Sequence, residues 1–293
     1  MNYRHHYHAG NYADVFKHVL LQQLVRAMQR KEKGFLYLDT HAGRGGYDLS
    51  TTNVLPDGRE RAPEWPAGIG RVWGAAGLPE EVSRYVAAVR EFQARASGAV
   101  AAGEPQLYPG SPWIVAAQLR AQDRAVLCEL REDDAEALAQ DFRAHRRVSV
   151  QRMDGYTALK AMLPPPEKRA LVLIDPPFEN ASEFADIRLA LREALARFPS
   201  GTYAIWYPIT ERAKSDRFLR EVAESPFAPP ALCAELQIAA DSAQVRMKGC
   251  GLLVLNPPWQ IDDEFRRVLP ALAERLRQDA GGEARVSWPV PER

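Results

Sequence analysis

Short apolar runs alternate with amphipathic segments along most of the chain. Runs typical of strands occupy residues 35–39, 125–130, 147–152, 170–174, 202–206, 231–239 and 251–255. Apolar positions at helical spacing predict helices at residues 14–30, 79–95, 133–142, 155–163, 183–198 and 212–224. Strands that alternate with helices predict a mainly parallel sheet that helices cover on both faces.

The first two predicted strands are separated by a segment that is too long for a simple crossover. Its residues, 47–122, include the helix at 79–95 and a second helix start at Ser111, a plausible N-cap, with Pro112 at the first helical position. We therefore expect an open α/β sheet formed by residues 1–46 and 123–293. Residues 47–122 are expected to form an inserted, mainly helical subdomain.

Composition narrows the class of protein. The chain has 293 residues, 46% of them hydrophobic, and its 38 basic residues balance 38 acidic ones, so disorder is not expected as the main state. Its apolar runs are far shorter than the ~18 to 20 residues of a membrane span, and no secretory signal opens the chain. Cysteines at Cys128, Cys233 and Cys250 are too widely spaced for a disulfide framework or a zinc ribbon. We expect a cytoplasmic protein without a metal.

The N-terminal segment is basic. Residues 1–35 hold six lysines and arginines against two acids, and four of the six histidines. Composition alone favours a solvated helix face on an N-terminal arm. The alternative is a contact with a polyanion or an anionic cofactor.

Residues at the ends of the predicted strands point to a nucleoside. In open α/β sheets, ligands bind beyond the carboxyl ends of the strands. A glycine loop at 42–46 follows the first strand, Glu129 ends the second, and Asp154 with Gly155 follows the third. Each acid alone is more often a helix cap or a solvated turn, but together they favour a bound nucleoside, with Glu129 on the ribose hydroxyls. The glycine spacing is not that of dinucleotide enzymes.

The fourth strand ends in the most informative tetrapeptide, Asp175, Pro176, Pro177 and Phe178. Two prolines fix the backbone and leave carbonyls free to accept hydrogen bonds. A carboxylate beside a rigid carbonyl can bind both hydrogens of an exocyclic amino group, and Phe178 offers a face for an extruded base. A proline-rich turn is the alternative.

A second tetrapeptide, Asn256 to Trp259, has the same pattern after a late strand. The fourth strand should lie beside the first at the switch in strand order, whereas a late strand is expected towards the edge of the sheet. We therefore assign the chemistry to Asp175 and a structural role to Asn256.

Together these motifs resemble the ribosomal large-subunit methyltransferase J family, which methylates N6 of an adenine in 23S rRNA. The most specific part is the opening from Tyr3 to Asn11, and the resemblance extends to Trp288 near the end of the chain. It also rests on the segments 36–43, 108–112, 173–177 and 256–259. The resemblance implies a Rossmann-like, S-adenosylmethionine-dependent methyltransferase fold, with the N-terminal arm as a flap over the active site.

The resemblance also implies residue roles. Asp175 would be catalytic, and Tyr3 and His5 would face the RNA, together with Pro176 and Phe178 at the base. S-adenosylmethionine would contact Lys17, His18, His41, Ser111, Glu129, Asp154, Gly155 and Asp175. Phe178 stands where the family pattern has tyrosine, which keeps the aromatic face but loses a hydroxyl.

The expected reaction is methyl transfer from S-adenosylmethionine to an adenine of free or partly assembled 23S rRNA, by a monomer that needs no metal. Two alternatives remain at this stage. The tetrapeptide alone is compatible with a DNA amino-methyltransferase, and the fold could also belong to a non-catalytic RNA-binding protein. A dinucleotide oxidoreductase is disfavoured by the glycine spacing.

Overall fold

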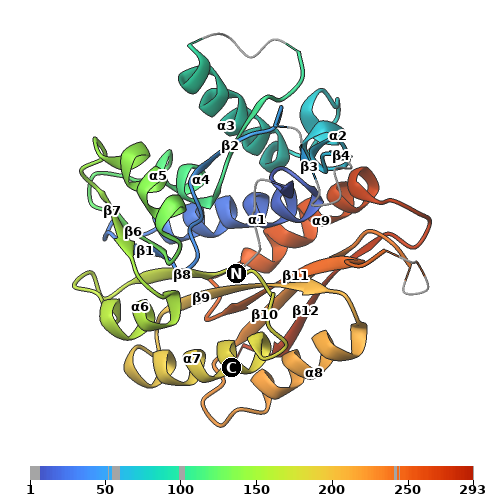
Figure 1. Ribbon diagram of the computed structural model, residues 1–293. Helices are drawn as coiled ribbons and strands as arrows, with labels where there is room; N and C mark the ends of the chain where they lie inside the picture. The colour runs from blue at the N-terminus through green and yellow to red at the C-terminus, as the bar shows by residue number, and fades with distance from the viewer. Residues whose placement is uncertain are drawn as a thin grey trace.

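The computed structural model describes residues 7–51, 53–54, 60–98, 103–240, 243 and 245–292. Within these residues, eight strands form the central sheet (Figure 1). From edge to edge their order is β12 (Glu283–Val290), β10 (Ala231–Gln237), β11 (Gly249–Leu255), β9 (Thr202–Ile209), β8 (Ala170–Ile174), β1 (Leu36–Asp39), β6 (Arg124–Glu129) and β7 (Val148–Arg152).

Strand direction places the ligand-binding crevice. The strands β7, β6, β1, β8 and β9 are parallel, whereas β11 runs antiparallel to both β9 and β10, and β12 runs antiparallel to β10. The chain proceeds outward from β1 through β6 to β7 and then returns to β8 on the other side of β1. The order therefore reverses between β1 and β8, the place where an open α/β sheet binds its ligand. The predicted α/β, Rossmann-like class is confirmed.

Helices cover both faces of the sheet (Figure 1). One face packs against α1 (Tyr12–Gln29), α5 (Glu132–Phe142) and α9 (Ile261–Leu276). The other packs against α6 (Gly155–Met162), α7 (Glu183–Arg197) and α8 (Arg212–Ala223). Alternate side chains of β1 enter the two cores, Tyr37 one and Leu36 with Leu38 the other, as the period of a strand requires.

The segment predicted as an insertion contains three α-helices and several short strands in its described part. The helices are α2 (Ile69–Trp73), α3 (Glu80–Ser97) and α4 (Ser111–Ala116), preceded by a 3-10 helix at Trp65–Ala67. The strands β2 (Gly46–Asp48) and β5 (Leu107–Pro109) pair with each other, as do β3 (Asn53–Val54) and β4 (Glu60–Arg61). Side chains of α3 and β5 share a core with α1, and the domain boundaries stay a prediction.

Three details differ from the expectations. The N-cap of α4 is Gly110, because Ser111 is already helical and directs its hydroxyl to Asp39. The sequence pattern did not predict α9 or β12.

The position of Asn256 also differs from the expectation. The strand β11, which precedes it, lies inside the sheet rather than at its edge. Because β11 runs antiparallel to β9, Asn256 still lies at the end of the sheet opposite Asp175. There its amide donates to the carbonyls of Pro199 and Gly201, at 2.8 Å each, which fits the structural role.

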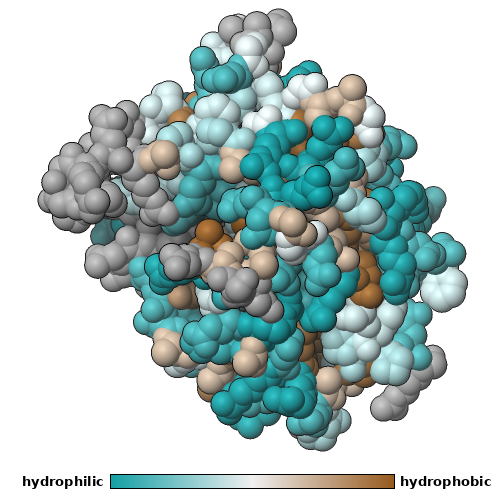
Figure 2. Space-filling view, turned by 90° about the vertical axis from the view of Figure 1, so that its right-hand side faces the viewer, coloured by the Kyte–Doolittle hydropathy of each residue, from teal (hydrophilic) through white to brown (hydrophobic). Residues whose placement is uncertain are grey.

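The distribution of hydrophilic and hydrophobic residues on the surface is typical of a globular protein. The face of the molecule in Figure 2 carries mainly hydrophilic residues, with hydrophobic ones in small, separate patches. Among the described helices, none combines the length and the hydropathy needed to span a bilayer.

Candidate active site

A buried carboxylate ends the central strand β1. The side chain of Asp39 is 0% exposed, and its Oδ2 accepts hydrogen bonds from Tyr37 Oη at 2.8 Å and Ser111 Oγ at 2.6 Å. Burial raises the pKa of Asp39 to about 6, although the two hydroxyl donors oppose the shift. Burial therefore disfavours the ionised form of Asp39 in the free protein. A cationic ligand bound nearby would stabilise that form.

The side chain of Lys17 joins α1 to the end of β8. Its Nζ lies 2.6 Å from Asp175 Oδ2 and 3.0 Å from Asp14 Oδ1, and the residue is only 6% exposed. Burial alone would lower the pKa of Lys17, but the two carboxylates raise it well above its usual value. The lysine therefore stays charged and holds one oxygen of Asp175 in place.

Loss of this ammonium should destabilise the fold, because two carboxylates would be left without their cation. We expect Lys17→Met to lower the free energy of unfolding by about 3 to 5 kcal/mol, the usual cost of breaking a buried ion pair. Urea denaturation at pH 7 measures it, with Arg26→Met, an exposed position on the same helix, as control. Equal midpoints for both variants would contradict a buried ion pair at this position.

The glycine loop after β1 is held by Glu129 at the end of β6. Glu129 Oε2 accepts from the backbone amide of Gly43 at 2.9 Å, and Oε1 accepts from the amide of Arg131 at 2.8 Å. Burial raises the pKa of Glu129, against the effect of these amides. These bonds do not use all the lone pairs of the carboxylate, so it can accept further donors, such as the hydroxyls of a ribose.

Helix α6, which follows β7, begins in contact with Thr40 at the end of β1. Asp154 is its N-cap and accepts from the amide of Thr157 at 2.7 Å. A Cβ on Gly155 would lie 2.2 Å from the carbonyl oxygen of Thr40, so only glycine permits this contact. Asp154 is thus a helix cap, as a single acid often is, and the helix that it caps begins against Thr40, directly after β1.

Two predicted histidines have different surroundings. His41 Nδ1 lies 2.8 Å from Thr40 Oγ1, and burial lowers the pKa of His41 to about 4, although the carboxylates of Asp175 and Asp154 oppose the shift. Its imidazole is therefore neutral at pH 7. His18 is 0% exposed and bonds through Nδ1 to Tyr108 Oη at 2.8 Å, so it also fixes α1 against β5.

The residues after Asp175 form a rigid, aromatic turn. Pro176 is buried, and Phe178 is half-buried with a φ of 49°, a left-handed conformation that is rare for an aromatic residue. Its ring packs edge-on against Phe184 and Trp206, with centroids 5.1 and 5.9 Å away. Tyr3 and His5 lie outside the described residues.

The structure brings most predicted residues together at one edge. Lys17 bonds to Asp175, Ser111 to Asp39, and Glu129 to the loop that follows His41, all around the carboxyl ends of β1, β6 and β8. Sequence reasoning did not assign roles to Asp39 and Asp14. Asp39 ends a strand like the other acids and could have been assigned by that signal. Asp14 gives no such signal, because its contact with Lys17 depends on where α1 packs.

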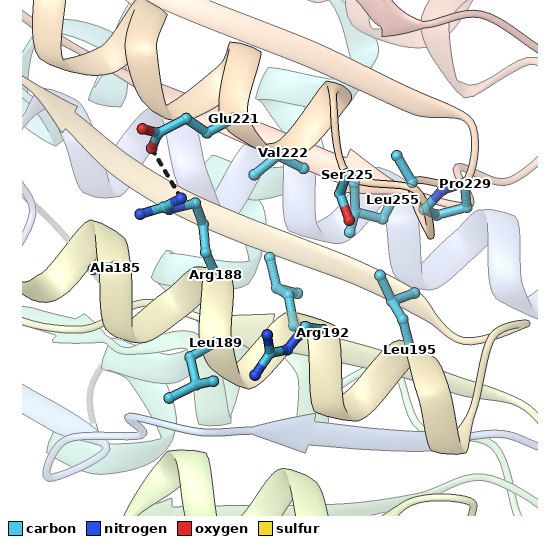
Figure 3. Close-up of a pocket in the computed structure, with 12 residues that line it drawn as sticks. Ala185, Arg188, Leu189, Arg192, Leu195, Glu221, Val222, Ser225, Pro229 and Leu255 are labelled. Atoms are coloured by element: carbon cyan, nitrogen blue, oxygen red, sulfur yellow. Dashed lines mark ion pairs between the residues drawn. The ribbon is translucent and has the colours of Figure 1, made fainter.

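A cavity of about 300 Å³ lies elsewhere, between α7 and α8 (Figure 3). Leu189, Leu195 and Val222 contribute apolar walls, and Arg188 forms an ion pair with Glu221 at 3.1 Å. None of the predicted site residues lines this cavity. Shape alone therefore does not locate the site, which rests on the charged groups at the strand ends.

Comparisons with known proteins agree with this geometry. The family model described as "Ribosomal RNA large subunit methyltransferase D, RlmJ" matches residues 32–290. Proteins named ribosomal RNA large subunit methyltransferase J from Haemophilus influenzae and Escherichia coli K12 are 39% and 38% identical to this chain, and each match covers 100% of both chains. A crystal structure of a Legionella pneumophila protein is 33% identical, with a TM-score of 0.83, and covers 96% of this chain and 98% of its own. The chain therefore belongs to the ribosomal RNA large subunit methyltransferase J family.

Proposed function

We propose that this protein transfers a methyl group from S-adenosylmethionine to N6 of a specific adenine in 23S rRNA, with Asp175 as the catalytic residue. The observation that carries the proposal is the position of the Asp175 tetrapeptide. It follows β8, directly beside β1 at the switch point, with Asp39 and Glu129 at the neighbouring strand ends. The relatives' names supply the rRNA substrate class.

The residues at the strand ends fit this cofactor. S-adenosylmethionine supplies a methyl group on a positively charged sulfur, together with an ammonium, a ribose and an adenine. The buried carboxylate of Asp39 suits positive charge, and the free lone pairs of Glu129 suit ribose hydroxyls. Lys17, His18, His41, Ser111, Asp154 and Gly155 are proposed to complete the cofactor site.

The adenine amino group is proposed to bind at Asp175. Lys17 holds Oδ2, which leaves Oδ1 free to accept one N–H, and the carbonyl of Pro176 can accept the other. This arrangement orients the nitrogen lone pair towards the methyl group, and in-line alignment accounts for much of the rate gain. In such a transfer the N6–carbon bond would form as the sulfur–carbon bond breaks, the sulfur would keep the electron pair, and the proton released from N6 would pass to solvent. Phe178 would stack on the extruded base, and Tyr3 and His5 would contact the RNA.

Cofactor affinity should depend on pH through Asp39. Only the ionised carboxylate attracts a cation, so affinity should rise with pH through the pKa of about 6 and level off above it. With that pKa, the ionised fraction falls about tenfold between pH 7 and pH 5, and so should the affinity. Isothermal titration with S-adenosylmethionine measures this effect. The Asp39→Asn variant should lose most of the dependence, and an unchanged profile in it would exclude Asp39 as the source.

Substrate class is tested by tritium transfer from labelled S-adenosylmethionine. Protein-free 23S rRNA, 16S rRNA and duplex DNA are compared under the same conditions. We expect label only in 23S rRNA. Label in DNA would favour the DNA amino-methyltransferase. RNA binding without any transfer would favour a non-catalytic protein.

The physiological setting is part of the proposal. We propose that the enzyme acts in the cytoplasm, as a monomer, on free or partly assembled 23S rRNA. No group of His, Cys, Asp and Glu side chains suited to a metal ion occurs in the described part of the chain, and the proposed chemistry requires none. The N-terminal arm would form a flap over the active site, and residues 47–122 would form the inserted subdomain.

A further inference from the structure

The edge of the sheet opposite the proposed active site is strongly basic. Four loops lead into the parallel strands β1, β6, β7 and β8 at residues 30–33, 120–124, 143–147 and 167–169, and we call them the basic edge. They hold ten lysines and arginines against three acids, a net of seven positive charges in a chain whose net charge is zero. The ten are Arg30, Lys31, Lys33, Arg120, Arg124, Arg143, Arg146, Arg147, Lys168 and Arg169.

Hydrogen bonds connect these loops, and the amide of Ala125, which donates to the carbonyl of Arg147 at 2.8 Å, joins the loop at 143–147 to the start of β6. Arg120 donates to the carbonyls of Gln29 and Lys31 at 3.0 Å each, and Arg169 donates to the carbonyl of Met28 at 2.6 Å. Arg124 bonds to Glu167 at 2.5 Å. Since adjacent strands lie about 4.8 Å apart, the four loops extend across about 14 Å, and their positions are fixed by the sheet.

Much of this charge is not neutralised. Arg120 pairs with Asp123, Arg124 with Glu167, and Arg30 with Glu264. Six exposed side chains make no ion pair within the described part of the chain: Lys31, Lys33, Arg143, Arg146, Arg147 and Lys168. Burial lowers the pKa of Arg169, and the nearby charge of Arg120 contributes in the same direction. Six exposed basic side chains on one edge of the sheet favour a polyanionic partner.

An exposed tryptophan lies beside the basic edge. Trp259 is 71% exposed, and Arg30 donates to its carbonyl oxygen. The turn is rigid because two prolines precede Trp259, and Asn256 and Gln260 adopt left-handed φ values of 49° and 60°. The amide of Asn256 anchors this turn, as described above. The fold thus holds a large apolar ring in solvent, which suits stacking of a nucleobase.

Acidic groups near the ring limit what it can bind. Asp262, Asp263 and Glu264 follow in the first turn of α9, and Glu264 already pairs with Arg30. Negative charge here disfavours a phosphate directly over Trp259. An uncharged base stacked on Trp259, with its phosphates bound by the basic side chains of the neighbouring loops, would avoid the acidic groups and use the basic ones.

We propose that the basic edge and Trp259 form a second RNA-binding surface, which holds the backbone of a segment of the same rRNA away from the target adenine. Strands of four to six residues separate this surface from Asp175, a distance of about 13 to 20 Å along the sheet. A long RNA can reach both edges, whereas a short fragment around the adenine cannot. This inference rests on the proposed function for its substrate.

Charge-neutralising variants test the phosphate contacts. We compare Lys33→Gln/Lys168→Gln and Arg146→Gln/Arg147→Gln with the control Arg192→Gln/Arg220→Gln, which removes two exposed charges from α7 and α8. Each test variant should raise the KM for full-length 23S rRNA about tenfold, with unchanged kcat and cofactor affinity. It should also reduce the slope of log K against log salt by about 1.5, since each lost phosphate contact contributes about 0.7 to 0.9. A KM and slope equal to those of the control would overturn the proposal and leave this edge to a partner other than RNA.

Substrate length and Trp259 provide further readouts. On a short fragment around the target adenine, wild type and test variants should have the same KM. Trp259→Ala should raise the KM for full-length RNA about 5- to 20-fold, within the range for loss of one stacked base, and Trp259→Phe should largely restore it. If Trp259→Phe were as impaired as Trp259→Ala, or neither had an effect, stacking would be excluded. Failure of the proposed function appears differently, as no methylation of any RNA by the wild type.

Discussion

Replacing Asp175 by alanine should reduce kcat for methyl transfer by about a thousandfold or more, while cofactor binding stays measurable. Loss of a preorganised polar group at a reacting centre commonly lowers kcat by about 10² to 10³, and here it also removes the partner of Lys17. Asp175→Asn keeps one acceptor oxygen, so it should retain more activity than Asp175→Ala. Single-turnover transfer to 23S rRNA gives the rate, and calorimetry gives the affinity for S-adenosylmethionine.

The second tetrapeptide offers a matched control. Asn256 lies in the same sequence pattern but at the opposite end of the sheet, where it bonds to the carbonyls of Pro199 and Gly201. Asn256→Ala should lower the free energy of unfolding, because two carbonyls lose their donor, but kcat at saturating RNA should be unchanged. Comparable losses of kcat in both variants, or full activity in Asp175→Ala, would refute the assignment of chemistry to Asp175.

Removing the carboxylate of Glu129 should weaken cofactor binding with little effect on kcat at saturating S-adenosylmethionine. Two hydrogen bonds from ribose hydroxyls to a charged carboxylate contribute about 1.5 to 3 kcal/mol each, so Glu129→Ala should raise the Kd about 100-fold or more. Glu129→Gln should have a smaller effect, because its amide still offers one acceptor. Isothermal titration measures both constants.

Glu132, an exposed acid close in sequence to Glu129, provides the control for loss of a negative charge. Glu132 begins α5 and pairs with Arg152 at 2.6 Å, away from the glycine loop. Glu132→Ala should leave the Kd unchanged. Since Glu129 also bonds to the amide of Gly43, thermal unfolding must show that Glu129→Ala remains folded. A folded Glu129→Ala variant with the wild-type Kd would mean that the ribose binds elsewhere.

Much of the fold could be predicted because its signals are local. Short apolar runs identify the parallel strands, and their order along the chain predicts that Asp175 lies beside β1, as the sheet shows. The pattern did not reveal that β11 inserts between β9 and β10, since pairing partners of late strands depend on contacts distant in sequence. The edge position expected for Asn256 was therefore wrong, whereas its structural role stays a prediction that its bonds to the carbonyls of Pro199 and Gly201 support.

The residues of the candidate site could be selected from the sequence where they lie at strand ends, and less so where their contacts depend on packing. Glu129, Asp154 and Asp175 stand out in the sequence because each follows an apolar run. The ion pair of Lys17 with Asp175 and Asp14 does not, because it forms only when α1 packs across the sheet. The burial that raises the pKa of Asp39 is likewise a property of the folded core. The roles of Tyr3 and His5 stay a prediction.

The most direct test of the central claim identifies the methylated atom. Protein-free 23S rRNA is incubated with the enzyme and S-adenosylmethionine that carries a deuterated methyl group, and the RNA is then digested to nucleosides for mass spectrometry. The proposed chemistry predicts deuterated N6-methyladenosine, which is absent when Asp175→Ala replaces the wild type. Deuterium on a ribose oxygen, on a pyrimidine carbon or on another base nitrogen would contradict it.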